Sequence, residues 1–395
     1  MTAQASASPV ALNSAGLGAL REGHPETAIR HFMDAIALDP QAVPLWMNLA
    51  TAHRAANQSD GELKALEAVL DLDRLHVMAW LRKGQLHQRE QDDAQALSAW
   101  RAAVQLADSL QTLAPDIARD LAAGKAFLDA RGGQLVTAVE AAFDGFLDEA
   151  DGQSQRRVDA FVKVATGQRQ VYSNQCAGLY YPFLPADEFF DDHHFPWFEE
   201  LNAKADAIRA EFEALYSDPG ESLQPYIRLD KGGPEAQWSD LNNSLDWGAL
   251  FLWEFGRPNE AVLARCPVTA KAVRSIPSAF IPGRAPNVMF SILRPGAHIP
   301  PHTGVTNTRA VVHLPLIVPE NCSFRVGGET RLWEERRAFA FDDTIEHEAW
   351  NKSSKFRAIL MLDVWNPHLS EIEQKAILNY FNAIDALGFG GLAKI

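Results

Sequence analysis

The amino-acid sequence predicts a multidomain α + β protein, in which an α-helical solenoid is followed by a β-sandwich or jelly roll with flanking helices. Three observations lead to this fold class. Small and large apolar residues recur every 34 residues in the first third of the chain. From about residue 175 the sequence becomes rich in aromatic residues and proline, and after residue 285 short β-type runs alternate with turn signals. We therefore expect helical repeats over residues 1–110, a helical cap or linker over 111–172 and a β-rich domain over 173–395.

The repeat is clearest at positions where helices of a hairpin must pack. Trp46 lies 34 residues before Trp80, and the same step relates a series of small residues and a series of large ones: Gly16, Ala50 and Gly84; Phe32, Leu66 and Trp100. Small residues let two helices approach closely, and large residues fill the space between hairpins. The spacing resembles the tetratricopeptide pattern, with a plain helical bundle as the alternative. A solenoid of such repeats commonly holds a peptide or another protein on its concave face.

Composition excludes several classes of partner. The chain has 395 residues, a formal net charge of −15 and a pI near 5.3, so nucleic acid and anionic membranes would be repelled by most of its surface. No apolar run is long enough to span a bilayer, and the first residues lack the pattern of a secretion signal. The three cysteines lie far apart, which predicts neither a disulfide framework nor a zinc knuckle. We expect a cytoplasmic protein.

The elements of the second half follow from their periodicity. Helical sequence continues from residue 109 to about 170, residues 201–216 read as one further helix, and a Ser-x-x-Glu-like cap at Ser370 begins a closing helix. Between the last two lie the β-type runs NVMFSIL, TRAVVHLPLIV, CSFRVGG, ETRLWEE, RAFAFDD, HEAWN and FRAILMLDVW. Short strands at this spacing favour a sandwich or jelly roll, which can hold a small ligand between its sheets.

Polar residues occur on strand faces that are otherwise apolar. Arg309 and His313 share one face of their run, and Arg357 shares a face with Ile359, Met361 and Asp363. An arginine in such a strand keeps its charge, so if it is buried it needs an anion. For Arg357 two anions remain open at this point: a bound dicarboxylate, or the side chain of Asp363.

Two histidines form a more specific pattern. His302 and His347 each lie at the edge of a β-type run, and Arg357 follows the second by ten residues. A single histidine is more often structural than a ligand, but this spacing is similar to that of the distal histidine and co-substrate arginine in 2-oxoglutarate iron oxygenases. Many of those enzymes have a carboxylate two residues after the first histidine. Here that position is Gly304.

Two long segments carry a family resemblance. SILRPGAHIPPHTGVTNTRAVVHLPL and WEERRAFAFDDTIEHEAWNKSSKFRAILMLDVWNP resemble the aspartyl/asparaginyl β-hydroxylase family, over about residues 180–370. The resemblance implies a double-stranded β-helix (jelly-roll) catalytic domain that hydroxylates the β-carbon of an Asp- or Asn-type side chain in a peptide or protein, releasing succinate and CO2. It implies Fe(II) on His302 and His347, with 2-oxoglutarate held by Ser291, His313, Arg357 and Trp247. Animal members of the family also join tetratricopeptide repeats to this domain.

The aspartyl hydroxylase branch itself has His-Thr-Gly at the first histidine, so Gly304 marks a branch rather than an inactive site. Arg309 matches a residue that contacts substrate. Animal enzymes carry a second arginine where this chain has Val311, and a glutamine where it has Ala249, so specificity for an acidic side chain is in doubt. Alternatives are a free or carrier-bound amino acid or a lipid as substrate, or a repeat scaffold with an inactive barrel. We expect Asp342 and Asp343 to close a turn or to support His347, with direct contact to the metal as the alternative.

Overall fold

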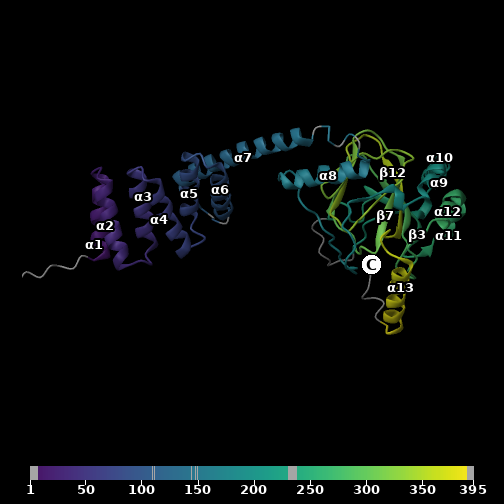
Figure 1. Cartoon of the computed structure of the whole chain (residues 1–395). Helices are drawn as coiled ribbons and strands as arrows, with labels where there is room; N and C mark the ends of the chain where they lie inside the picture. The colour runs from purple at the N-terminus through teal and green to yellow at the C-terminus, as the bar shows by residue number, and fades with distance from the viewer. Residues whose placement is uncertain are drawn as a thin grey trace, which may run out of the picture. The chain divides into compact units, whose positions relative to one another are not determined.

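The computed structural model describes residues 8–108, 110, 112–143, 145–146, 148, 150–229 and 238–388. The chain divides into two compact units, Met1–Ala150 and Asp151–Ile395, which are treated separately below (Figure 1). The predicted limits of the repeats and the linker, at residues 110 and 172, remain a proposal. Within the described ranges, no helix is both long and apolar enough to cross a membrane.

The first unit consists of helical hairpins that repeat with the predicted step. The first helices of the hairpins begin 34 residues apart, at Pro9, Val43 and Val77, and the second helices do the same. The helices are α1 (Pro9–Arg21), α2 (Pro25–Leu38), α3 (Val43–Ala55), α4 (Ser59–Leu72), α5 (Val77–Arg89), α6 (Asp93–Ala107) and α7 (Pro115–Phe143). They follow one another as stacked pairs in Figure 1. The predicted solenoid is confirmed, and the plain bundle is wrong.

The recurring small and large residues meet at the hairpin contacts. A Cβ added to Gly16 would lie 2.6 Å from the ring of Phe32, and one added to Gly84 would lie 2.7 Å from the indole of Trp100. Trp100 is buried, and helix α7 closes over its other side at Gly124, where a Cβ would overlap the indole ring. Helix α7 therefore caps the third hairpin.

This packing predicts opposite effects for the same substitution at two glycines of α7. Gly124→Ala should lower the free energy of unfolding of the first unit by about 1–3 kcal/mol, because the buried indole cannot move aside. Gly133→Ala, where an added Cβ meets nothing within 4 Å, should instead stabilise by about 0.5–1 kcal/mol through helix propensity. Urea unfolding followed by circular dichroism measures both. Equal stabilities would mean that α7 does not cap the hairpin.

The second unit is built on two antiparallel sheets. Among the described residues, eight strands form one sheet, in the order β1-β10-β7-β12-β5-β3-β2 with β4 on β3, and four form the other, in the order β6-β11-β8-β9. The strands are β1 (Phe189–Phe190), β2 (Leu223–Pro225), β3 (Trp247–Glu254), β4 (Arg257–Pro258), β5 (Val288–Leu293), β6 (His298–His302), β7 (Arg309–Ile317), β8 (Cys322–Val326), β9 (Glu329–Arg331), β10 (Phe339–Phe341), β11 (His347–Asn351) and β12 (Arg357–Trp365). This arrangement confirms the predicted jelly roll with flanking helices.

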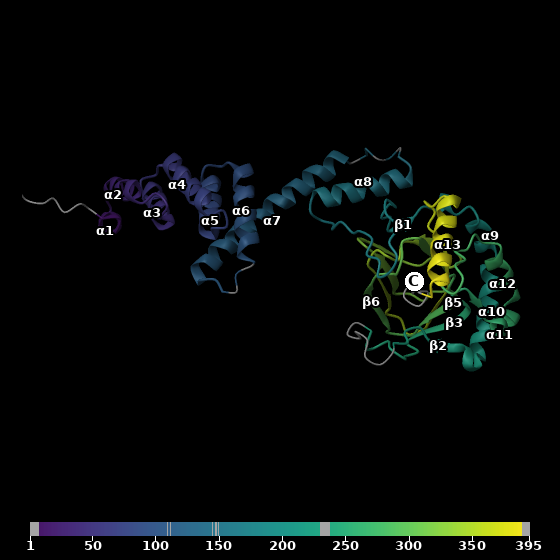
Figure 2. The same cartoon turned by 90° about the horizontal axis from the view of Figure 1, so that it is seen from below.

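Helices cover the outer face of the larger sheet, so its inner face is left for the site. Phe212 of α10 packs against Phe290 of β5, with ring centroids 5.2 Å apart, in a core that also holds the outward residues of β7 and β12. Figure 2 shows α9, α10, α11 and α12 together on that side of the strands. The helices of this unit are α8 (Gly152–Ala165), α9 (Phe198–Ala203), α10 (Ala205–Ser217), α11 (Glu260–Arg265), α12 (Pro267–Arg274) and α13 (Glu371–Ala386), with short 3₁₀ turns at Asp192–His194 and Gly220–Ser222.

Three sequence expectations can be compared with these elements. The closing helix is confirmed, and Ser370 forms a capping box with Glu373. The single helix expected over 201–216 is wrong, because the chain tightens at Lys204, whose amide donates to Leu201, and so separates α9 from α10. Strand β3 was not expected, because its first six residues are buried on both faces and show no alternation.

Candidate active site

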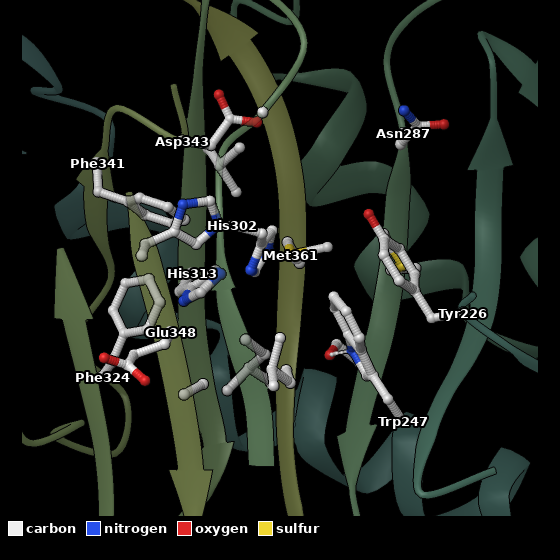
Figure 3. A pocket seen from close by; sticks show the side chains of 18 of the residues that line it. Tyr226, Trp247, Asn287, His302, His313, Phe324, Phe341, Asp343, Glu348 and Met361 are labelled. Carbon is white, nitrogen blue, oxygen red and sulfur yellow. Dashed lines mark hydrogen bonds between the residues drawn. The ribbon is translucent and has the colours of Figure 1, made fainter. Parts of the chain in front are cut away.

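A cavity of about 300 Å³ lies between the two sheets of the second unit. Figure 3 shows His302 and His313 on one side of it and Tyr226 and Trp247 on the other. The cavity brings together every site residue expected from the sequence: Trp247, Ser291, His302, Arg309, His313, His347 and Arg357. The exposed His193 lies outside its lining, as does His194.

The two expected metal ligands face each other on neighbouring strands. His302 of β6 pairs directly with His347 of β11, and their ring centroids are 4.0 Å apart. The Nδ1 atoms lie 2.8 Å from the carbonyl oxygen of Pro300 and 3.0 Å from that of Ile345, which leaves each Nε2 as the free lone pair. Burial lowers the pKa of His302, and it lowers the pKa of His347 well below its usual range. Two neutral imidazoles with free Nε2 atoms suit a divalent transition metal.

Among the described residues, no third protein ligand completes this pair. Within the described part of the chain, no group of three His, Cys, Asp or Glu side chains is arranged to hold a metal. At Gly304 an added Cβ would overlap the carboxylate of Asp343, so a side chain at this position would require Asp343 to move. Burial raises the pKa of Asp343 to about 7, although Arg309 opposes that shift. Asp343 lies in a turn, as expected, and its carboxylate also lines the cavity beside Gly304.

Arg357 is a buried cation that has no counter-ion among the described residues. Its side chain is 1% exposed, and burial lowers its pKa to about 10, so it remains charged at neutral pH. Among the described residues no carboxylate forms an ion pair with it, its Nε has no hydrogen-bond partner, and its guanidinium lies 4.8 Å from the ring of Trp333. A cation in such a place requires an anion that the described protein does not supply.

Ser291 extends the polar group around Arg357. Its Oγ accepts a hydrogen bond from Trp247 Nε1 at 3.1 Å and another from Arg357 Nη1 at 3.3 Å. Both lone pairs are then engaged, which leaves the hydroxyl proton of Ser291 to donate to an added anion. His313 is also buried, and burial lowers its pKa well below its usual range. The group therefore combines one cation with neutral donors, as a carboxylate-binding site does.

The other arginine of the cavity does have a partner. Arg309 Nη1 lies 2.7 Å from Asp363 Oδ2, and both side chains are nearly buried. Asp363 also accepts from the amide and side chain of Asn287, at 2.7 and 3.2 Å. Of the two anions left open for Arg357, the structure thus assigns the Asp363 side chain to Arg309.

Two further lining residues were missed in the sequence. Tyr226, just after β2, stacks on Trp247 with ring centroids 4.1 Å apart, and Trp333 lies over Arg357. Tyr226 belongs to a segment without a strand or helix period. Trp333 belongs to the expected β-type run ETRLWEE, but strand β9 ends at Arg331, so the alternation of that run does not reach Trp333. The signal available was only their aromatic character, which favours packing equally well.

The fold and the site together define an antiparallel double-stranded barrel with paired neutral histidines and an unpaired buried arginine. Residues 202–367 match the family model described as aspartyl/asparaginyl beta-hydroxylase. The second unit therefore contains a domain that matches the aspartyl/asparaginyl beta-hydroxylase family model, as the sequence resemblance predicted.

Individual relatives cover limited parts of the chain. Human aspartyl/asparaginyl beta-hydroxylase is 38% identical over 139 residues, which are 35% of this chain and 18% of that protein. The ornithine lipid ester-linked acyl 2-hydroxylase of Rhizobium tropici is 34% identical over 192 residues, covering 48% of this chain and 64% of that protein. The chain thus spans less than two thirds of each relative. Among solved structures, the Sgt2 TPR domain of Aspergillus fumigatus is 21% identical, with a TM-score of 0.27, and covers 37% of this chain and 93% of that one.

Proposed function

We propose that the protein is an Fe(II)- and 2-oxoglutarate-dependent dioxygenase that hydroxylates an amino-acid side chain of the Asp/Asn type, at its β-carbon, in a peptide or protein. The observation that carries the proposal is Arg357, a buried cation with no ion-pair partner among the described residues, in the same cavity as two facing neutral imidazoles. A dicarboxylate that reaches both the arginine and a metal would satisfy the two features together.

Each polar residue has a role in this proposal. His302 and His347 would hold Fe(II) through their Nε2 atoms, kept in that tautomer by the carbonyl groups of Pro300 and Ile345. Arg357 would pair with the distal carboxylate of 2-oxoglutarate, and Ser291 would donate its free hydroxyl proton to it. His313 would contact the carboxylate of 2-oxoglutarate that lies nearer the metal. Trp247 would orient Ser291 through its Nε1 hydrogen bond and line the cavity beside it.

When bound, iron and 2-oxoglutarate supply the oxidising chemistry that places a hydroxyl group on carbon, with release of succinate and CO2. The protein contributes a cavity between two sheets, whose aromatic walls exclude water, and an orientation for the C–H bond. The test is succinate formation from 2-oxoglutarate by the full chain with added Fe(II). A metal-chelated sample should form none, and equal rates with and without iron would remove the proposal.

A lipid is the second candidate substrate. The Rhizobium relative is named for hydroxylation of an acyl chain, and the middle of the cavity is apolar, with Met289, Ile359 and Met361 along its floor.

We place the protein in the cytoplasm and, within the proposal, assign the repeats to recruitment of a peptide or protein substrate. A lipid substrate would leave the repeats an assembly role only.

Removal of the repeats separates these roles. A chain starting at Asp151 should retain succinate formation, because every residue assigned above lies in the second unit. Its KM for a protein substrate should rise about tenfold or more, since docking on a second surface raises the effective concentration of substrate at the site. Steady-state kinetics on the identified substrate measures this. An unchanged KM would mean that the repeats do not recruit it.

A further inference from the structure

The cavity has two polar ends separated by an apolar floor. Along β12 the inward side chains are Arg357, Ile359, Met361 and Asp363, so the two ends are about 20 Å apart along the strand. Register places Ser291 opposite Ile359 and Met289 opposite Met361. The end at Arg357 is occupied by 2-oxoglutarate in the proposed function. The end at Asp363 is then left for the substrate.

Charge at the substrate end is already balanced by the protein. Arg309 and Arg357 are the arginines that line the cavity within the described ranges, and lysine does not line it. The Arg309 charge is neutralised by Asp363, which three donors hold: Arg309 Nη1 and the two nitrogens of Asn287. Those three donors hold the carboxylate of Asp363 beside Arg309. Among the described residues, no unpaired cation lines this end of the cavity.

The residues beside Arg309 and Asp363 disfavour binding of an anion at the substrate end. Val311, which pairs with Asp363 across β7 and β12, is apolar. Asp343 adds a second carboxylate close to Arg309, and its buried Oδ1 has no hydrogen-bond partner. A carboxylate entering here would meet the charge of Asp363 and the partial negative charge that Asp343 carries near neutral pH, while Arg309 is already paired.

Neutral polar groups have partners available at the same end. The hydroxyl of Tyr226 points into the cavity near Asn287 in Figure 3, and it makes no hydrogen bond to another described residue. Arg309 Nε is buried and unpartnered. Each can donate one hydrogen bond to a neutral acceptor, such as an amide carbonyl or an ester oxygen.

We infer that the substrate group bound between Tyr226, Arg309 and Val311 carries no negative charge, so that the protein does not hydroxylate an ionised aspartate or another carboxylate-bearing group. The inference rests on the proposed function and narrows its substrate class to uncharged or cationic groups. Val311 and Asp363 become the specificity-determining residues. Val311 stands where a second cation would be needed, and Asp363 neutralises the charge of Arg309.

The test uses isotope-labelled O2 to mark oxygenated products, and products that also form without the added enzyme are subtracted. The full chain, with Fe(II) and 2-oxoglutarate, is incubated with a cell extract that contains proteins, lipids and metabolites, and labelled products are identified by mass spectrometry. Wild type should label groups without a carboxylate. Val311→Arg should raise the ratio of carboxylate-bearing to uncharged products at least about tenfold, the effect of one added charge-assisted hydrogen bond. Val311→Leu, the apolar control, should keep the wild-type ratio.

A second variant keeps the test decisive if the arginine introduced at Val311 prevents folding. Asp363→Asn keeps an acceptor for Asn287 and frees the charge of Arg309, so it should shift the products in the same direction as Val311→Arg. Labelled aspartate or glutamate side chains as the main wild-type products would overturn the inference while leaving the dioxygenase intact. Succinate is measured in the same samples, and its absence from wild type would instead remove the proposed function.

Discussion

Replacement of either His302 or His347 by alanine is expected to abolish iron-dependent conversion of 2-oxoglutarate to succinate. Within the described ranges, the Nε2 atoms of His302 and His347 are the two protein nitrogens positioned to hold the metal. Loss of one leaves a single imidazole, which cannot retain Fe(II) in competition with water and buffer. The rate should fall to the metal-free background. Metal content after desalting, measured by atomic absorption, should fall with it.

His193→Ala provides a matched control, since this histidine is exposed on a 3₁₀ turn outside the cavity lining. It should leave both metal content and rate unchanged. Circular dichroism establishes that the site variants fold. Folded alanine variants that still form succinate at the wild-type rate would show that the facing histidines are not the metal site.

Replacement of Arg357 by methionine should weaken binding of 2-oxoglutarate without destabilising the protein. The apparent affinity for 2-oxoglutarate should fall by at least about a hundredfold, because a carboxylate left unpaired in a buried site costs about 3–5 kcal/mol. Without 2-oxoglutarate the variant should be as stable as wild type or more stable, because it replaces an uncompensated buried cation with an apolar side chain of similar length. A titration of 2-oxoglutarate followed by thermal unfolding measures both effects.

Arg325 supplies the contrast for this prediction. It pairs with Glu346 at 2.8 Å and with the nearly buried Glu348 at 2.5 Å. Arg325→Met should therefore destabilise the protein by about 1–3 kcal/mol, because Glu348 loses a charged partner. If Arg357→Met destabilises the 2-oxoglutarate-free protein as much as Arg325→Met does, Arg357 is a structural residue and not a co-substrate ligand.

Sequence pattern predicted those parts of the site that depend on a strand's own period. The faces of β7 and β12 place Arg309, His313, Arg357 and Asp363 inside the barrel as expected, since successive side chains alternate. Partners across strands were not predictable in the same way. The pairing of Asp363 with Arg309 depends on the register of β12 on β7, which no local period determines.

Two other features lay beyond the reach of sequence reasoning for different reasons. Strand β3 lies between helices and cavity, so both its faces are buried and its apolar run could not be distinguished from a helix segment. The carboxylate of Asp343 lies against Gly304, about forty residues away in the chain, and only the antiparallel return of the smaller sheet brings them together. The 34-residue step, by contrast, is local and predicted every hairpin of the first unit.

The central claim is that one cavity holds both Fe(II) and 2-oxoglutarate, joined through His302, His347 and Arg357. Anaerobic titration of 2-oxoglutarate into the Fe(II)-loaded full chain tests it most directly, because chelation of Fe(II) by a 2-oxo acid produces a weak visible absorption band. The account predicts a saturable band at one equivalent in wild type, a band that needs at least about a hundredfold more 2-oxoglutarate in Arg357→Met, and no band in His347→Ala. Wild-type protein that binds Fe(II) but shows no band at any concentration of 2-oxoglutarate would contradict it.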